Sequence, residues 1–354
     1  MARALILSAE LGAGHDLPAE LLAAALRERG AEATIADGLT EMGEITQTLG
    51  RRGAETIVRR APVIFDIQYW LIQRFPPTRR LGAWLLEWWG RRGLLRLIER
   101  ERPDVIVSTY PGTTDVLGRM RRAGRLRIPC VAAVTDLAAL RFWAHPGIDR
   151  HLIIHEESRA EVEAIAGAHA DIRQVRGFSR PQFDDPPTRT RARAALELPA
   201  GPLVLISGGG WGVGDLRRAA AAAQAIGATP VALCGTNDEL RERLDRDGVR
   251  AEGFTTRICE WMAAADVLVH STAGLTVREA ELCGTWAISY GWGVGHIRIN
   301  NDAYRRFGLA AVADTPQALE EELTRALSEP RPRPRAAADL PAAADEVLEL
   351  INAR

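Results

Sequence analysis

The chain has 354 residues, of which 47% are hydrophobic and 26% charged, and its formal net charge is −1. This length and composition are typical of a soluble globular protein with two α/β domains, and they exclude a disordered or fibrous chain. A net charge near zero provides no global field that would favour binding to nucleic acid.

The cysteines and the N-terminus indicate where the protein works. The four cysteines are scattered and lack CxxC or Cys/His ligand spacing, so neither a disulfide framework nor a structural zinc site is expected. Residues 1–8 run directly into a strand and lack the long apolar core of a signal peptide. No apolar run approaches the ~20 residues that span a bilayer. We therefore expect a cytoplasmic protein, which could still touch a membrane surface.

Short strand-like runs alternate with helical stretches along the whole chain. The expected strands are Ala4–Ser8, Ala33–Ala36, Asp104–Thr109, Cys130–Thr135, His151–His155 and Ile172–Val175, then Leu203–Ser207, Pro230–Cys234, Val267–His270 and Ala287–Tyr290. Several are continuous apolar runs, which is the pattern of parallel strands buried on both faces. The alternation predicts doubly wound α/β domains.

The apolar periodicity lapses over residues 180–201, where Pro, Asp and Arg are frequent, and the expected linker within this stretch is residues 186–201. This linker is expected to lie between an N-terminal domain of residues 1–185 and a C-terminal domain of residues 202–335. The Pro-rich end of the second domain cannot continue as a regular helix. A last amphipathic helix is expected within residues 336–354.

The first motif, Ser8–His15 (SAELGAGH), follows the first strand. Gly12 and Gly14 form a flexible turn at the carboxyl edge of the sheet, where open α/β sheets bind ligands. Because position 17 is leucine, the GxGxxG fingerprint of dinucleotide-binding folds is not met. His15 is a candidate general base, since a neutral imidazole can take a hydroxyl proton at pH 7. The alternative is a helix cap or a solvated first-turn residue.

Two later segments also follow strands, Ser108–Asp115 (STYPGTTD) and Val134–Asp136 (VTD). In a parallel sheet both strand ends lie at the same edge as His15. Asp136 is therefore a second candidate catalytic residue, which would orient His15 or contact a substrate. The alternative for Asp136 is again a helix cap.

The segment Ser207–Gly214 (SGGGWGVG) contains five glycines after a buried strand. Such a loop before a helix forms a backbone nest suited to phosphate oxygens, and Gly14, Gly209, Gly210 and Trp211 are candidate binding residues. No GK[ST] follows, so this is not the P-loop of a nucleotide hydrolase.

The most informative stretch is Gly253–Gly284. It predicts a strand end, a helix, an apolar strand, and a turn of small residues that opens a further helix carrying Glu279. Backbone N–H groups and the dipole at that helix start favour an anion, and an acid within two turns suits a ribose diol. The candidate nucleotide-binding residues are Phe254, Thr255, Thr256, Ser271, Thr272, Ala273, Gly274, Leu275, Thr276 and Glu279.

This stretch resembles the donor-nucleotide site of GT-B glycosyltransferases. GAGH with Ala19 resembles the GxGHxxxA signature of the group that contains monogalactosyl- and glucosyl-diacylglycerol synthases and the N-acetylglucosaminyltransferase that makes lipid II. The resemblance implies a GT-B fold of two Rossmann-like domains facing across a cleft, with the last helix returning to the N-terminal domain. It also implies a UDP-sugar donor, His15 beside the acceptor, and neither cofactor nor metal.

Two segments depart from that group. Arg141 stands where relatives carry a histidine ahead of Trp143. Within GWGVGHIRINN, His296 and Ile297 replace the glutamine and acid that hold sugar hydroxyls, whereas Asn300 is kept. His296 and Asn300 are candidate donor-binding residues, but the choice among glucose, galactose and N-acetylglucosamine is not predicted, because sugar recognition depends on such paired polar groups.

Residues 60–100 combine Trp70, Trp84, Trp88 and Trp89 with many arginines. Residues 51–100 hold eleven arginines against four acidic residues, a local charge of +7. This mixture is typical of a surface that lies among the headgroups of an anionic leaflet, which would place the protein on the inner face of the plasma membrane. The alternative is ordinary helix packing with solvated arginines.

Taken with the resemblance, the motifs predict an inverting transferase that moves a hexose from a UDP-sugar to a hydroxyl of diacylglycerol or a related lipid. Three alternatives stay open. They are transfer to a small hydrophobic aglycone, a UDP-sugar epimerase, and a nucleotide-binding homologue without catalysis.

Overall fold

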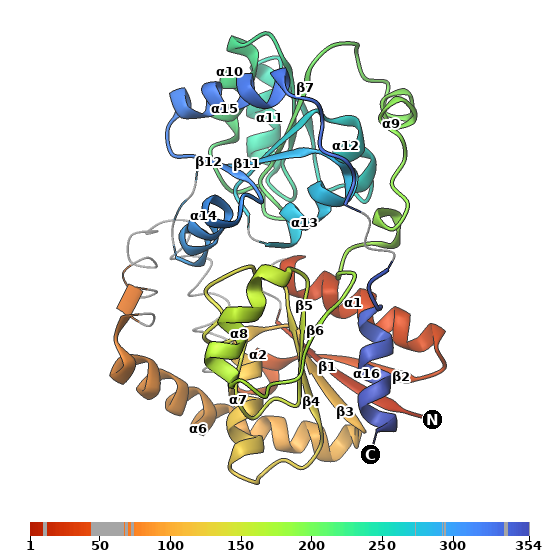
Figure 1. Ribbon diagram of the computed structural model, residues 1–354, viewed down its shortest axis with the longest axis vertical. Helices are drawn as coiled ribbons and strands as arrows, with labels where there is room; N and C mark the ends of the chain where they lie inside the picture. Colours follow the sequence, from red (N-terminus) through yellow and green to blue (C-terminus); the bar gives the residue numbers. More distant parts are fainter. Residues whose placement is uncertain are drawn as a thin grey trace. The chain divides into compact units, whose positions relative to one another are not determined.

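The computed structural model describes residues 1–9, 13–43, 67, 70–71, 74–272, 274–291, 293, 295–335 and 339–353. The chain divides into two compact units. The first contains Met1–Ser179, Val294–His296 and Asp339–Arg354, and the second contains Arg180–Gly293 and Ile297–Ala338. Each unit has one six-stranded sheet, and every strand pair in both sheets is parallel (Figure 1).

The first unit is built on the sheet β2-β1-β3-β4-β5-β6. The chain runs from β1 outward to β2 and then in the other direction from β3, so the order reverses between β1 and β3. Ligands of open α/β sheets bind at such a switch point. The elements are β1 (Arg3–Ser8), α1 (Ala13–Glu28), β2 (Glu32–Asp37), α2 (Gly38–Glu41), α6 (Pro76–Glu101), β3 (Val105–Ser108), α7 (Pro111–Arg122), β4 (Cys130–Val134), β5 (Arg150–Ile153), η2 (Glu156–Ser158), α8 (Arg159–Ala166), β6 (Ile172–Gln174) and α16 (Ala343–Asn352).

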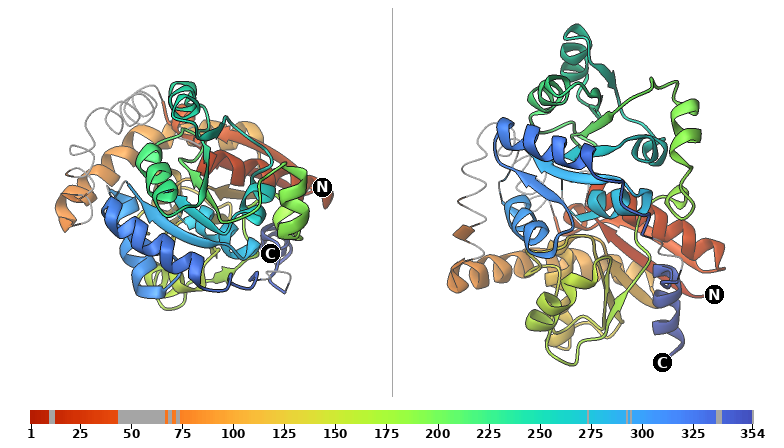
Figure 2. Two further views of the ribbon diagram at one scale, coloured as in Figure 1. Left: turned by 90° about the horizontal axis from the view of Figure 1, so that it is seen from above. Right: turned by 45° about the horizontal axis from the view of Figure 1, so that its top comes forward.

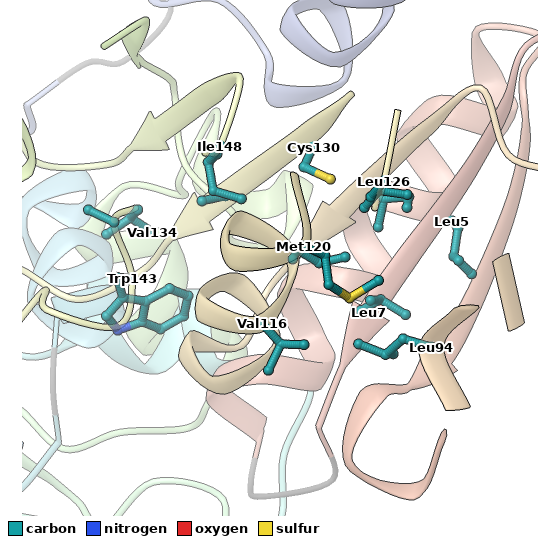
Figure 3. Close-up of a cluster of buried hydrophobic side chains, with 14 of the residues drawn as sticks. Leu5, Leu7, Leu94, Val116, Met120, Leu126, Cys130, Val134, Trp143 and Ile148 are labelled. Carbon is teal, nitrogen blue, oxygen red and sulfur yellow. The ribbon is translucent and has the colours of Figure 1, made fainter. Parts of the chain in front are cut away.

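Apolar side chains from strands and helices form the core of this unit (Figure 3). Leu5 and Leu7 of β1 are fully buried, as are Leu94 of α6 and Met120 of α7. Helices α6 and α7 pack against each other. The ring of Trp143, in the loop after β4, belongs to the same cluster and is only 2% exposed, so that loop is anchored in the core.

The C-terminal helix α16 belongs to the first unit, where it packs beside α1 (Figure 1). A buried arginine attaches it to the sheet. Arg150 of β5 donates from Nη1 to Glu346 Oε2 at 2.8 Å and from Nε to Asp171 Oδ2 at 2.8 Å. Its side chain is 4% exposed. Removing one partner of a buried ion pair costs about 3–5 kcal/mol, so this contact fixes the position of α16.

The second unit is built on the sheet β12-β11-β10-β7-β8-β9, with its switch point between β7 and β10. Helices α10 and α15 pack side by side, and α12 packs against both α9 and α13 (Figures 1 and 2). The elements are η3 (Pro181–Phe183), α9 (Arg189–Ala195), β7 (Leu203–Ser207), α10 (Leu216–Ala225), β8 (Thr229–Leu233), α11 (Asp238–Arg246), β9 (Arg250–Glu252), α12 (Ile258–Ala264), β10 (Val267–His270), α13 (Gly274–Cys283), β11 (Trp286–Tyr290), α14 (His296–Phe307), β12 (Ala311–Ala313) and α15 (Pro316–Ser328).

The doubly wound α/β architecture predicted from the sequence is confirmed, and all ten predicted strands are present. The structure adds β9 and β12, which have three residues each and no continuous buried run. The two units can be set beside the domains expected from the sequence. The units change between Ser179 and Arg180, and the expected linker at 186–201 contains α9, which packs on α12.

Candidate active site

His15 lies near the start of α1, at the switch point of the first sheet. Its Nδ1 is 3.0 Å from the backbone oxygen of Thr109, the residue that follows β3. In return, the Thr109 hydroxyl donates to the backbone oxygen of His15 at 3.0 Å. A carbonyl oxygen can only accept, so Nδ1 carries the proton and Nε2 keeps its lone pair. The first turn of α1 therefore presents an imidazole with its basic nitrogen left available.

Two aromatic rings surround this imidazole. The Tyr110 ring stands edge-on at a centroid distance of 5.3 Å, and the Trp143 ring is tilted at 5.8 Å. Burial among these groups lowers the pKa of His15 from its ordinary value of 6.5, against a smaller opposing effect of Asp136. Desolvation penalises the charged imidazolium, so His15 is neutral at pH 7 and can act as a base.

Asp136 follows β4 by two residues and is half-buried. Its Oδ2 accepts a hydrogen bond of 3.0 Å from the indole nitrogen of Trp143. Its influence on His15 is electrostatic, whereas the hydrogen bond that orients the imidazole comes from Thr109. The two predicted catalytic residues are thus brought together, and their positioning partners, Thr109 and Trp143, are additions from the structure.

The histidine of the β4–β5 loop, His145, has a structural role. His145 Nδ1 accepts from the N–H of Gly147 at 3.0 Å, and burial lowers the pKa of His145 to about 4. A Cβ on Gly118 would lie 2.2 Å from this nitrogen. Arg141, which stands where the resembling group has a histidine, is exposed.

The glycine-rich loop after β7 lies at the switch point of the second sheet. Gly212 has a φ of +60°, and a Cβ there would lie 2.0 Å from the oxygen of Cys234, so only glycine fits. The Gly210 oxygen accepts from the Thr236 N–H at 2.9 Å. Among the described residues, the N–H groups of Gly210 and Trp211 have no acceptor. The loop carbonyls are thus hydrogen-bonded within the protein, while neighbouring N–H groups have no acceptor among the described residues. This arrangement forms a backbone nest suited to an anion.

The turn after β10 is locked to this loop. The Ser271 hydroxyl donates to the Val213 oxygen at 2.7 Å, and a Cβ on Gly209 would come within 3.0 Å of the Thr272 methyl carbon. Helix α13 begins immediately afterwards, at Gly274. The predicted Ser271 hydroxyl is therefore used in holding the two loops together. Ala273 lies outside the described residues.

Helix α13 carries the predicted ribose partner. Glu279 stands in its second turn and is 7% exposed. Another acid of the same helix, Glu281, points to a different side of α13 and is engaged by Arg278 Nη1 at 3.0 Å and by Arg335 Nη1 at 3.5 Å. Leu275 and Thr276 of the first turn are half-buried. The charge of Glu281 is thus neutralised locally, and Glu279 stays the predicted partner of the ribose.

The remaining predicted residues differ in accessibility. Phe254, which follows β9, is 60% exposed, and Thr256 beside it is also exposed. The Thr255 hydroxyl accepts from the N–H of Arg257 at 3.0 Å. On α14, His296 is half-buried, whereas Asn300 is completely buried. The role of His296 and Asn300 in donor binding stays a prediction.

A cavity of about 670 Å³ lies in the second unit at the opposite edge of the sheet, where the chain enters β7 and β10. Arg193 donates there to Asp266 at 2.9 Å and to the Gly201 oxygen at 2.7 Å. Arg331 donates to four oxygen acceptors around it. These charges are satisfied within the protein, and no predicted site residue lines the cavity.

Across the described segments, no group of three or more His, Cys, Asp and Glu side chains is placed to hold a metal ion. The same part of the chain contains no helix that is long and apolar enough to span a bilayer.

Comparisons with known proteins agree with these features. The family model for monogalactosyldiacylglycerol (MGDG) synthase matches residues 15–177. The processive diacylglycerol beta-glucosyltransferase of Bacillus pumilus is 25% identical over 342 residues, covering 92% of this chain and 86% of the relative. The protein of the same name from Bacillus subtilis is 24% identical over 355 residues, covering 92% and 87%.

Two crystal structures show the same fold. MurG of Acinetobacter baumannii aligns over 100% of both chains with a TM-score of 0.56 and 16% identity. Arabidopsis thaliana UGT89C1 complexed with UDP aligns over 100% of this chain and 99% of its own, with a TM-score of 0.59 and 12% identity. The predicted GT-B fold class is confirmed. The chain therefore has the GT-B fold, is similar to the processive diacylglycerol β-glucosyltransferases over most of its length, and matches the model of the monogalactosyldiacylglycerol synthase family over residues 15–177.

Proposed function

We propose that this chain is an inverting, UDP-sugar-dependent hexosyltransferase that glycosylates a hydroxyl of diacylglycerol or a related lipid. The observation that carries the proposal is the hydrogen bond between His15 Nδ1 and the Thr109 oxygen. It sets the tautomer in which Nε2 is the base, and the lowered pKa keeps that base neutral. The names of the relatives support the reaction and the acceptor class.

The proposed reaction is a single displacement. His15 Nε2 takes the proton of the acceptor hydroxyl as its oxygen attacks C1 of the sugar, while the bond between C1 and the UDP oxygen breaks on the opposite face. One new glycosidic bond forms and UDP leaves as an anion. The configuration at C1 is inverted.

The second unit is proposed to stabilise the departing diphosphate. The N-terminus of α13 and the N–H groups of Gly210 and Trp211 supply positive potential where negative charge develops. Glu279 is proposed to accept hydrogen bonds from the ribose diol, and the backbone around Phe254 to face the uracil. His296 is proposed to lie near the sugar. None of these interactions requires a metal ion, so we expect the enzyme to turn over in the presence of excess EDTA.

The lipid acceptor requires access to a membrane, and helix α6 offers a surface for it. Trp84 and Trp88 are 53% and 51% exposed and stack at a centroid distance of 6.3 Å. Trp70 is 55% exposed and contacts Phe75 at 5.3 Å. Trp89 is half-buried. Large apolar side chains exposed together mark an interaction site.

We propose that this aromatic surface (Trp70, Phe75, Trp84 and Trp88), with the arginines of α6, docks on the anionic cytoplasmic leaflet of the plasma membrane. Aromatic rings suit the interfacial layer, and arginines are attracted to anionic headgroups. The protein would then reach its acceptor as a peripheral protein of that leaflet.

The test is turnover with defined substrates. UDP-glucose, UDP-galactose and UDP-N-acetylglucosamine are each offered with diacylglycerol in micelles that contain phosphatidylglycerol, and the products are identified by mass spectrometry. The expected product is a glycosyldiacylglycerol whose new linkage is β, read from its proton spectrum. A parallel reaction offers a small aromatic alcohol in place of the lipid. Glycosylation of that alcohol alone would favour the small-aglycone alternative, and UDP binding without any product would favour a homologue that has lost catalysis.

A further inference from the structure

A buried histidine at the donor end of the second sheet has no part in the reaction proposed above. His270 is the last residue of β10 and is 1% exposed. It pairs in register with Ser207 of β7 on one side and with Ser289 of β11 on the other. His270 therefore lies under the switch point, directly before the Ser271–Gly274 turn.

The contacts of His270 define its tautomer. Its Nδ1 accepts a hydrogen bond of 3.3 Å from the Thr272 N–H and lies 3.4 Å from the Thr272 hydroxyl. A nitrogen that accepts carries no proton, so the proton is on Nε2. That nitrogen has no hydrogen-bond partner among the residues described, and the ring meets the Tyr304 ring of α14 edge-on at 6.0 Å. Burial lowers the pKa of His270 to about 4, so this single neutral form persists at physiological pH.

Thr272 is the point where this hydrogen bond acts on the donor site. The Thr272 methyl group lies against Gly209 of the glycine-rich loop. The neighbouring Ser271 hydroxyl holds the same loop at Val213. The two residues after His270 thus fix two points of the loop, and Thr272 is itself held by His270 Nδ1.

We propose that His270 is a positioning residue for the donor diphosphate, which holds Thr272, and through Thr272 the glycine-rich loop, in the shape that binds UDP. The proposal rests on the proposed function, because it takes the loop and the start of α13 as the diphosphate site. The unpartnered Nε2–H supports it. A buried donor without an acceptor is destabilising, so a side chain needed only to fill space would be apolar. The acceptor at Nδ1 explains why an imidazole stands there.

A matched pair of variants distinguishes the effect of the hydrogen-bond acceptor of His270 from the effect of its side-chain volume. His270→Asn keeps an acceptor oxygen near the position of Nδ1. His270→Leu has a side chain of similar size to histidine but no hydrogen-bond acceptor. UDP affinity is measured by calorimetry, and kcat and KM are measured for the UDP-sugar that the wild type turns over. We expect His270→Leu to raise the UDP Kd and the donor KM roughly tenfold, with kcat at saturating donor within about twofold. His270→Asn should stay within about threefold of the wild type in all three quantities.

The outcomes distinguish the two proposals. If the wild type binds no UDP, the proposed function and this inference both fail. If the wild type binds UDP and His270→Leu binds it equally well, or if His270→Asn loses as much affinity as His270→Leu, only the inference fails. Should His270→Leu not fold, His270→Val replaces it, because valine suits a β-strand and likewise offers no acceptor to the Thr272 N–H. It should also raise the UDP Kd roughly tenfold, and an unchanged Kd would overturn the inference.

Discussion

At the switch point of the first sheet, between β1 and β3, the chain places an imidazole among aromatic rings and ties it to one backbone oxygen. At the switch point of the second sheet, between β7 and β10, it places glycines and small hydroxyl residues whose carbonyls are tied down. The first arrangement controls the protonation and orientation of a single side chain. The second exposes backbone N–H groups to an anion. A change at the first site should therefore alter the rate of the reaction, and a change at the second should alter donor affinity.

The largest expected effect tests the first site. His15→Ala should lower kcat by roughly 10²–10⁴-fold, the usual contribution of a general base. The UDP Kd should stay within about twofold of the wild-type value, because His15 does not belong to the proposed nucleotide site. Steady-state kinetics and calorimetry measure the two quantities. Near-normal turnover of the variant would assign the base to Asp136 or to another group.

Glu279→Ala tests the second site. It should weaken UDP binding by about 1.5–3 kcal/mol, the range for a hydrogen bond to a charged group, which corresponds to about 10- to 150-fold in Kd. Glu281→Ala, on the same helix, is the matched control, because Glu281 is engaged by Arg278 and Arg335. Its UDP affinity should be near that of the wild type. Equal losses in both variants would contradict the assignment of the ribose to Glu279.

The pH dependence should differ between the sites. The reaction needs neutral His15, and burial places its pKa below 6.5. With respect to this group, kcat should be level above pH 6.5 and fall about tenfold per pH unit below the pKa of His15. The KM for the UDP-sugar should not follow this profile, because the buried histidine of the donor site, His270, has a pKa of about 4. If kcat and KM followed the same pH profile, the assignment of the rate to the first site and of donor affinity to the second would be contradicted.

The aromatic surface consists of Trp84 and Trp88 on α6 and of Trp70 and Phe75 just before this helix. Replacing Trp84 and Trp88 by Ala should weaken binding to vesicles containing phosphatidylglycerol roughly tenfold, because each replacement removes apolar area that the membrane interface would bury. Added salt should weaken binding further, because arginines contribute about 1 kcal/mol each near an anionic surface. Vesicle flotation measures this. Phe307→Ala is the control, because Phe307 is 37% exposed beside Arg306 on α14, and binding by this variant should be unchanged.

The smallest expected effect sharpens the description of the first site. Trp143→Phe keeps an aromatic ring but removes the N–H that holds Asp136. We expect kcat to fall roughly two- to tenfold, the size of one hydrogen bond, with the UDP Kd unchanged. The acid limb of the kcat profile should also move if Asp136 influences His15 electrostatically. An unchanged kcat with an unchanged acid limb would leave Trp143 as a core residue only.

Much of the fold could be predicted because its strands are buried apolar runs at regular spacing. The strands that were not predicted, β9 and β12, are short and only partly buried, so they carry no hydrophobic pattern. Helix α9 was hidden within a Pro- and Arg-rich stretch, where composition indicates a linker. Its arginine Arg193 pairs with Asp266, a contact across seventy-three residues that no local pattern shows.

The candidate site could be predicted as positions but not as contacts. Glycines, small hydroxyls and His15 are recognisable because their residue types are required. The atom that orients His15 is the backbone oxygen of Thr109, and every residue has such an oxygen. The indole bond of Trp143 to Asp136 likewise depends on how the β4–β5 loop folds back. The sequence indicated which residues to consider, and tertiary packing decided that Ser271 holds the loops together and that Asn300 is buried.

The attachment of α16 through Arg150 has a consequence for biosynthesis. The first unit is assembled from residues before Ser179 and residues after Asp339, with the second unit encoded between them. During translation, Arg150 is made almost two hundred residues before its partner Glu346. A nascent chain can therefore complete the second unit while the first still lacks its last helix and holds a guanidinium paired only with Asp171. We expect that final docking to be the step at which the newly made enzyme matures.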